Sequence, residues 1–296
     1  MGNNVTVGLV GAGAMGSAVG AAYAAGGARV VTTLDGRSDR TRRLATAAGL
    51  GLLPDLSEVV RVADIVLSVV PPESAPAVAG DVAAAAGRTG SVPLVADLNA
   101  VSPRTMQELA ALLGDNGLEL VDGSISGGPP RPGGSTRIYL SGPRAPELAA
   151  LPAPGVDARV VGDAVGTASA VKMCTASVYK GTIGLLAHAL LTAHANGVLS
   201  HVLDDLREGY PDLVERAPVS IARAAAKSER FVAEMREIAE TQRAAGLPAD
   251  LFEGFAEVYA ALARTPLARE APETIDAKMS LDDVLAALAA AAGRAR

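Results

Sequence analysis

The sequence predicts an α/β protein in which a Rossmann-type domain is followed by an all-α domain, with a long helix joining the two. Three observations predict it. Short apolar runs alternate with helical stretches up to residue 162, which indicates βαβ units and a parallel sheet. A glycine-rich turn joins the first apolar run to the first helical stretch. After residue 162 the pattern changes to stretches rich in Ala and Leu, in which we find no convincing strand.

The elements of the first domain follow from runs of Val, Ile and Leu that end at Gly, Pro or polar residues. We expect strands over residues 5–10, 28–34, 64–70, 93–97, 118–121, 136–140 and 158–161. One helix follows the glycine turn up to residue 25, and others are expected over residues 38–48, 74–86 and 102–113. The last of these has Ser102 as its cap and Pro103 at its first position.

The stretch from Asp163 to Ser200 contains no proline and is dominated by Ala and Leu, which favour helix. A helix of this length would span roughly 50 Å, more than the width of a small domain, so we expect it to connect two domains. Because the length favours two domains over one, we place a cofactor-binding domain at 1–162 and a helical substrate and dimerisation domain at 163–296. Further helices are expected over residues 219–245, 248–264 and 281–292.

Composition and charge exclude several classes of function. The net charge of −6, without a block of like charges, argues against a nucleic-acid partner. The single cysteine, Cys174, excludes an internal disulfide, and the three histidines lack the spacing of a helical metal site, so we expect no metal. The apolar run 182–199 carries His188, His194 and Asn196, which favours a buried helix over a membrane span. We expect a cytoplasmic protein.

The glycine-rich turn fits the pattern G-x-G-x-x-G between a predicted strand and a predicted helix, although a purely structural turn has the same pattern. Its residues are Gly11, Ala12, Gly13, Ala14, Met15 and Gly16. In this context Gly11 permits the tight turn, Gly13 lets the main chain approach a pyrophosphate, and Gly16 lets helix and strand pack closely. The helix N-terminus supplies N–H groups for phosphates. We therefore predict a nicotinamide dinucleotide site at these six residues.

The end of the second strand selects between NAD and NADP. Asp35 could accept hydrogen bonds from an adenosine ribose, which would indicate NAD. Arg37 followed by Ser38 suits a 2′-phosphate, because a guanidinium binds it in a bidentate manner and a hydroxyl adds a donor. The alternative is a solvated helix face, which is what we expect for Arg40 and Arg43. We favour NADPH over NAD, with Arg37 and Ser38 at the phosphate.

A second glycine-rich segment, Ser126-Gly127-Gly128, follows the strand expected to end at residue 121. Its N–H groups and hydroxyl suit an anion such as a carboxylate, although an ordinary loop has the same composition. On the long helix, Lys172 shares one face with Thr175 and Tyr179, three and seven residues later. A desolvated lysine supplies a proton and a positive charge to a developing alkoxide. The structural alternatives are a surface lysine and a packed core tyrosine.

Five motifs stand in a characteristic order: GAGAMG at 11–16, SVVPP at 68–72, DLNAVSP at 97–103, DGSISGG at 122–128 and GTASAVKM at 166–173. Over residues 5–200 the chain thereby resembles the β-hydroxyacid dehydrogenase and 6-phosphogluconate dehydrogenase superfamily. The later KSERFVAEMREIAE at 227–240 is similar to an uncharacterised branch whose C-terminal domain resembles that of phosphogluconate dehydrogenases.

The resemblance implies a role for each motif. Val70, Pro71 and Asn99 would border the ribose and the nicotinamide. The segment Ser126-Gly127-Gly128 would bind a substrate carboxylate, and Lys172 would be the general acid/base.

Two departures from the family concern the hold on the substrate. The family has Asn where this chain has Ala176, beside Thr175, and phosphogluconate dehydrogenases have Glu where it has Tyr179.

We expect an NADP(H)-dependent oxidoreductase acting on the CH–OH group of a small 3-hydroxy acid, or on the corresponding aldehyde or keto acid. Imine reductases share this scaffold and usually replace the lysine, so C=N reduction is the alternative, and a non-catalytic dinucleotide sensor is a third. The long apolar helix also predicts a homodimer.

Overall fold

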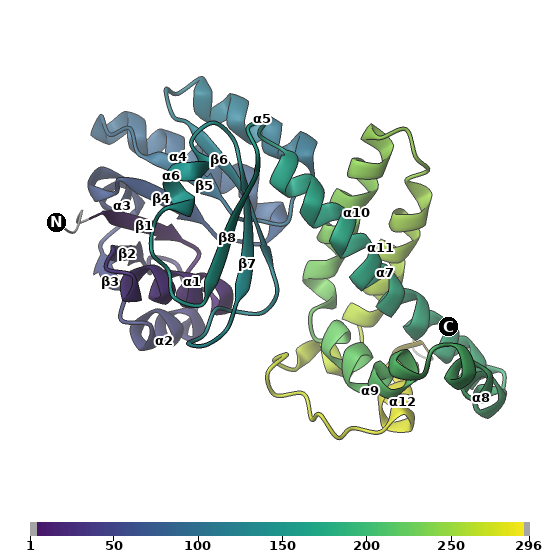
Figure 1. Ribbon diagram of the computed structural model, residues 1–296. Coiled ribbons are helices and arrows are strands. Elements are labelled where there is room, and N and C mark those ends of the chain that lie inside the picture. The colour runs from purple at the N-terminus through teal and green to yellow at the C-terminus, as the bar shows by residue number, and fades with distance from the viewer. Residues whose placement is uncertain (1–4, 293–296) are drawn as a thin grey trace. The chain divides into compact units, whose positions relative to one another are not determined.

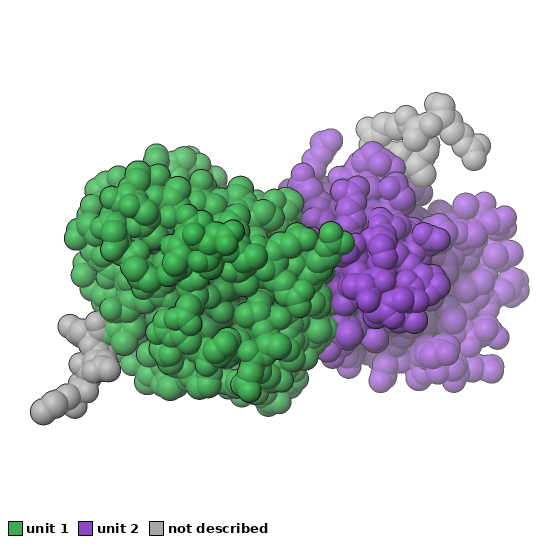
Figure 2. All heavy atoms as spheres, turned by 90° about the horizontal axis from the view of Figure 1, so that it is seen from above, with its two compact units in different colours: residues 1–173 green, residues 174–296 purple. Residues whose placement is uncertain are grey.

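The computed structural model describes residues 5–292. The chain divides into two compact units between Met173 and Cys174, shown in two colours in Figure 2. The division falls inside the long helix α7 (Thr167–Ala195). The domain boundary predicted at residue 162 precedes that helix and stays a prediction.

The first unit is built on one eight-stranded sheet in the order β3-β2-β1-β4-β5-β6-β7-β8 (Figure 1). Neighbours from β3 to β6 are parallel, β7 runs antiparallel to β6, and β8 is parallel to β7. The first six strands thus have the doubly wound Rossmann order. The strands are β1 (Thr6–Val10), β2 (Arg29–Thr33), β3 (Gly51–Leu53), β4 (Ile65–Ser68), β5 (Leu94–Asp97), β6 (Leu120–Ser126), β7 (Thr136–Ser141) and β8 (Val156–Gly162).

Helices cover both faces of this sheet, so its central strands are apolar throughout rather than alternating (Figure 1). Leu67 and Ala96 belong to a core shared with α1 and α6, whereas their neighbours Val66 and Val95 belong to a core shared with α4 and α5. The helices are α1 (Ala14–Ala25), α2 (Asp39–Ala47), α3 (Leu56–Val62), α4 (Ala75–Thr89), α5 (Pro103–Gly114) and α6 (Ala145–Ala149), with a 3-10 turn, η1 (Pro72–Ser74), before α4.

Side-chain caps fix where three of these helices begin. Ser102 Oγ accepts a hydrogen bond from the N–H of Thr105 at 3.1 Å, and Pro103 is the first residue of α5, as predicted. Ser38 caps α2 in the same way. Asp55 accepts from the N–H of Glu58 at 2.9 Å and so starts α3, a helix that we did not predict although the D-x-x-E signature is present.

The second unit is helical. Beyond α7 it contains α8 (Leu199–Gly209), α9 (Pro211–Ala225), α10 (Ser228–Ala244), α11 (Asp250–Ala263), a 3-10 turn η2 (Pro266–Arg269) and α12 (Leu281–Ala292). Gly184 lets α11 approach α7 closely, since a Cβ there would lie 3.0 Å from the Phe255 ring. Lys180 of α7 is ion-paired with buried Glu234 of α10, and its carbonyl accepts from the Tyr259 hydroxyl at 2.7 Å.

The predicted fold class is confirmed, but three element boundaries are wrong. The strand expected to end at residue 121 continues to Ser126, because β7 pairs with its second half. The helix expected over 219–245 is two helices: α9 starts at Pro211 and tolerates Pro218 inside it, and α10 begins at Ser228. The long helix ends at Ala195, shortly before Gly197, whose φ of 70° leaves the helical region.

Candidate functional site

The carboxyl ends of the central strands form one edge of the sheet. Val10, Ser68, Asp97 and Asp122 are consecutive partners in the pairing of β1, β4, β5 and β6. From Asp122 onwards β6 extends past this row to Ser126, paired with β7. The glycine turn, the segment after β4 and the glycines after β6 therefore leave the sheet at the same edge, where open α/β sheets bind their ligands.

The glycine turn is tight at both ends. Gly11 has a φ of 95°, and a Cβ there would lie 2.3 Å from the carbonyl oxygen of Val69. A Cβ at Gly16 would lie 2.0 Å from the carbonyl oxygen of Gly11, so α1 packs directly on the turn. Ser17 secures this geometry by donating to the carbonyl of Ala12 at 2.7 Å. Both glycines are required by the fold itself, as the pattern predicts.

Gly13 differs from these two glycines because the space beside it is open. It is the N-cap residue of α1, which has no side-chain cap, and a Cβ there would have no heavy atom of the described chain within 4 Å. The next residue, Ala14, is exposed, and Met15 is half-buried against the core. An uncapped helix N-terminus beside such a space fits the pyrophosphate of a dinucleotide, with N–H groups of the first turn as donors.

The segment after β2 carries the residues predicted to select the cofactor. Gly36, with a φ of 65°, turns the chain, and both Asp35 and Arg37 are exposed. Ser38 is also exposed, and its Oγ accepts from the N–H of Thr41 at 3.3 Å as the cap of α2. Because β2 is the parallel neighbour of β1, this segment leaves the same edge of the sheet as the glycine turn.

A buried polar cluster fixes the segment after β4. Asn99 is 3% exposed; its Oδ1 accepts from the N–H of Val70 at 2.6 Å, and its Nδ2 donates to Ser68 Oγ at 2.9 Å and to Asp97 Oδ2 at 2.7 Å. Burial raises the pKa of Asp97 to about 6, although hydrogen bonds from Asn99 and Ser68 oppose the rise. The Asn99 amide is therefore directed into the protein, and the groups it holds at the edge are half-buried Val70 and exposed Pro71.

The end of β6 carries Ser126-Gly127-Gly128, the segment predicted to bind a carboxylate, which we call the S-G-G cradle. Ser126 is its last residue, half-buried, and is paired with Arg137 of β7. Gly127 has a φ of 118°, and added Cβ atoms at Gly127 and Gly128 would meet nothing within 4 Å among the residues that are described. Thr136 Oγ1 donates to the carbonyl of Gly128 at 2.9 Å and holds the segment to β7. Only the two glycines, and not Ser126, lie beyond the strand.

Lys172 lies next to this cradle within the first unit. It is half-buried on α7, and its Nζ donates to the carbonyl of Ile125 at 2.7 Å, one residue before Ser126. Lys172 and the S-G-G segment therefore lie close together, and both belong to the first unit. Thr175 and Tyr179 follow on α7 in the second unit; Thr175 is half-buried, and the Tyr179 side chain is 70% exposed and so is not a core tyrosine.

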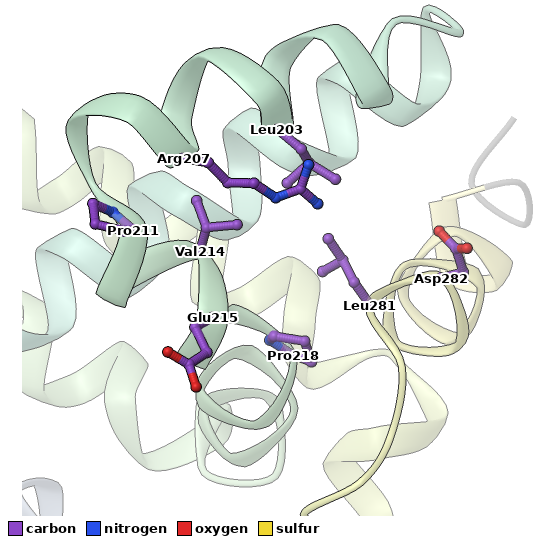
Figure 3. A pocket seen from close by; sticks show the side chains of 8 residues that line it. All are labelled: Leu203, Arg207, Pro211, Val214, Glu215, Pro218, Leu281 and Asp282. Atoms are coloured by element: carbon purple, nitrogen blue, oxygen red, sulfur yellow. The ribbon is translucent and has the colours of Figure 1, made fainter.

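The second unit contains a cavity between α8, α9 and α12 (Figure 3). Its apolar lining consists of Leu203, Pro211, Val214, Pro218 and Leu281. Arg207 also lines it and donates to Asp204 at 2.7 Å. Its lining includes none of the predicted site residues. Within residues 5–292 we find no group of three His, Cys, Asp or Glu side chains placed to hold a metal ion. None of the helices in this range combines the length and the hydropathy of a transmembrane span.

Comparison with known families agrees with the motifs in the sequence. Residues 6–148 match the NAD binding domain of 6-phosphogluconate dehydrogenase, and residues 193–262 match a domain of unknown function, DUF1932. An uncharacterized 28.5 kDa protein of Methanothermus fervidus is 31% identical over 179 residues, which cover 60% of this chain and 67% of that protein. The chain belongs to the 6-phosphogluconate dehydrogenase-like superfamily of β-hydroxyacid dehydrogenases, as its motifs predicted.

Solved structures give the same fold. A conserved hypothetical protein from Sinorhizobium meliloti is 28% identical, with a TM-score of 0.64, covering 98% of this chain and 97% of that one. A 3-hydroxyisobutyrate dehydrogenase of Mycobacterium tuberculosis is 21% identical, with a TM-score of 0.65 and coverage of 91% and 97%. An imine reductase of Streptomyces aurantiacus is 18% identical, with a TM-score of 0.54 and coverage of 90% and 97%. The family indicates a nicotinamide dinucleotide as the cofactor.

The difference between Gly13 and Gly11 can be tested by matched alanine substitutions. We expect Gly13→Ala to lower the free energy of unfolding by less than about 1 kcal/mol, because its φ of −71° suits alanine and only the N-cap preference for glycine is lost. The added methyl group would enter the open space proposed for the pyrophosphate, so NADPH binding should weaken by about tenfold or more. Gly11→Ala should lower the free energy of unfolding by about 2 kcal/mol or more, through strain and the contact with Val69. Urea unfolding followed by circular dichroism and titration calorimetry measure the two effects. Unchanged NADPH affinity in Gly13→Ala would contradict the assignment.

Proposed function

We propose that this protein is an NADP(H)-dependent oxidoreductase that acts on a small 3-hydroxy acid or on the corresponding aldehyde or keto acid. The observation that carries the proposal is the placement of Lys172 Nζ, 2.7 Å from the carbonyl of Ile125 and beside the Ser126-Gly127-Gly128 cradle. An amine and an anion cradle at the edge that also carries the glycine turn are what reduction of a carbonyl acid requires.

Each part of this edge has a role in the proposal. The N–H groups at the start of α1 and the open space at Gly13 would hold the pyrophosphate. Val70 and Pro71, fixed by Asn99, would border the nicotinamide ring and ribose. When bound, the reduced nicotinamide supplies the hydride. Ser126 and the N–H groups of Gly127 and Gly128 would bind the substrate carboxylate.

Lys172 would hold the proton at its Nζ and deliver it to the substrate oxygen as negative charge develops there. The same ammonium would stabilise that charge before the proton moves. Thr175 and Tyr179 would contribute hydrogen bonds to the substrate from α7. In the reverse direction Lys172 would accept the proton of the hydroxyl group as the general base.

Imine reduction is the second candidate. It is favoured by Ala176, which replaces the asparagine that the family uses to hold a substrate hydroxyl. Retained Lys172 favours the hydroxy acid. The two functions differ in substrate, so a panel of small aldehyde acids, keto acids and cyclic imines, monitored by NADPH oxidation, separates them.

Replacement of the lysine tests the proposed mechanism. We expect Lys172→Ala to lower kcat for the best substrate of the panel by about 10²- to 10⁴-fold, because it removes the proton donor. Lys278→Ala, at an exposed lysine, is the matched control and should leave kcat unchanged. A Lys172→Ala variant as active as the unmodified protein would rule out the mechanism and favour a different reaction or a dinucleotide sensor.

The cofactor preference is tested at the segment after β2. We expect Arg37→Ala to raise KM for NADPH by about tenfold and to leave KM for NADH nearly unchanged, because it removes a charged contact to the 2′-phosphate. Arg43→Ala changes an exposed arginine of α2 and serves as the control. If the ratio of activities with NADPH and NADH were the same in both variants, the preference for NADP would be wrong.

We also propose a homodimer formed through α7. Val178 and Leu185 are 65% and 61% exposed, two helical turns apart on this helix, and exposed apolar groups so aligned are typical of interfaces. Light scattering at micromolar concentration should give twice the monomer mass. Leu185→Glu should lower it to the monomer mass, whereas Leu251→Glu, at a leucine of α11 exposed to 60%, should not. A monomeric unmodified protein would refute the proposal.

A further inference from the structure

Asp122 has a buried carboxylate that none of the predicted roles uses. Its side chain is 0% exposed and accepts hydrogen bonds from the N–H groups of Gly166 at 2.8 Å and Ser169 at 3.1 Å. It also accepts from the hydroxyls of Ser141 at 2.8 Å and Ser169 at 2.7 Å. Two of its four donors are main-chain N–H groups at the start of α7, so the carboxylate of a sheet residue caps this helix.

The negative charge of the Asp122 carboxylate is favourable at the N-terminus of the helix that it caps. The N-terminus of a helix carries partial positive charge from aligned peptide dipoles, and α7 is 29 residues long. A buried carboxylate is tolerated when it accepts several hydrogen bonds, as this one does. Asparagine could keep the oxygen that accepts three of these hydrogen bonds, but its NH₂ group would face the Ser169 hydroxyl, which would have to accept instead of donate, and the negative charge at the helix N-terminus would be lost.

The same helical turn is joined to the sheet by two more contacts. Ser124 Oγ donates to the carbonyl of Ala168 at 2.9 Å, and the N–H of Ala168 donates to Ser141 Oγ at 3.0 Å. All of these groups are buried. The first turn of α7 is therefore held on β6 and β7 through both its N–H groups and a carbonyl, which fixes its rotation about the helix axis as well as its distance from the sheet.

Lys172 lies one helical turn beyond this anchor. It follows Ser169 by three residues, so both side chains leave the same face of α7. Ser169 contacts Asp122, and Lys172 contacts the carbonyl of Ile125, three residues further along β6. A rotation or shift of the first turn would move the ammonium away from Ile125 and from the neighbouring Ser126.

We propose that Asp122 is a positioning residue that, by capping α7, fixes the ammonium of Lys172 at the end of β6. The proposal concerns the same site as the proposed function and its kinetic consequence rests on that function. The hydrogen bonds of the Asp122 carboxylate are to Ser141, Gly166 and Ser169, and these residues belong neither to the glycine turn nor to the S-G-G cradle. Removal of the carboxylate should therefore affect the proton-transfer step and spare dinucleotide binding.

The placement of the lysine can be observed directly, because Lys172, Lys180, Lys227 and Lys278 are the four lysines of the sequence. Protein labelled with ¹³C-lysine should give four resolved side-chain CH₂ signals by NMR, with that of Lys172 assigned through Lys172→Arg. We expect Asp122→Asn to shift the Lys172 signal and leave the other three in place. The matched control, Asp115→Asn, at an exposed aspartate that caps the end of α5, should shift none of the four.

Kinetics then separate positioning from a loss of structure. In Asp122→Asn we expect kcat to fall by about 10- to 100-fold, while KM for NADPH changes by less than about twofold. Ser169→Ala removes one donor and should give the same two changes to a smaller extent. If Asp122→Asn does not fold, as judged by circular dichroism, Ser169→Ala and Ser141→Ala provide the test.

The possible outcomes distinguish this proposal from the proposed function. An unmoved Lys172 signal in folded Asp122→Asn and Ser169→Ala would overturn the positioning role, even with a lower kcat. A shifted Lys172 signal together with full activity in Lys172→Ala would overturn the proposed mechanism and leave the anchoring of the amine established. A shifted signal with a lower kcat and an unchanged KM for NADPH would support both.

Discussion

The shared register of the central strands is the constraint on which the site depends. Val10, Ser68, Asp97 and Asp122 are partners across four neighbouring parallel strands, and Ser141 of β7 continues the row. The chain leaves the sheet just after the first three positions. A slip of one residue in any strand would turn its side chains to the other face, so both apolar cores and the placement of the polar groups depend on the same pairing.

The two buried aspartates in this row, Asp97 and Asp122, have different hydrogen-bond partners. Asp97 lies beside Ser68 and Asn99, and burial still raises its pKa to about 6. Its folded-state pKa exceeds the ordinary value, so its contribution to stability is complete at low pH and is lost as the pH rises through about 6. Asp122 meets the N-terminus of α7 and two serine hydroxyls. Asp97 thus holds Asn99, which fixes the segment after β4, whereas Asp122 holds the N-terminus of α7.

The predictions that depend only on neighbouring residues in the sequence agree with the structure. The glycine turn, the Ser102 cap and the alternation of strands and helices depend on neighbours in sequence, and these predictions are confirmed. The extension of β6 to Ser126 depends on pairing with β7, and Asp122 finds its donors between 19 and 47 residues away, so no signal near either residue in the sequence indicates its role. The position of Lys172 on the long helix and a family motif both indicate this residue, but its contact with Ile125 is visible only in three dimensions.

The division of the chain inside α7 separates the residues of the proposed site into two groups. Lys172 and Met173 belong to the first unit, and Thr175 and Tyr179 to the second. The glycine turn, the S-G-G cradle and the lysine are therefore all held by one sheet and its register. Thr175 and Tyr179 belong to a helical unit with its own core, around Phe231, Phe252 and Tyr259. The register that places the groups of the proposed chemistry is therefore set within the first unit, by the pairing of β1, β4, β5 and β6, and does not depend on the core of the helical unit.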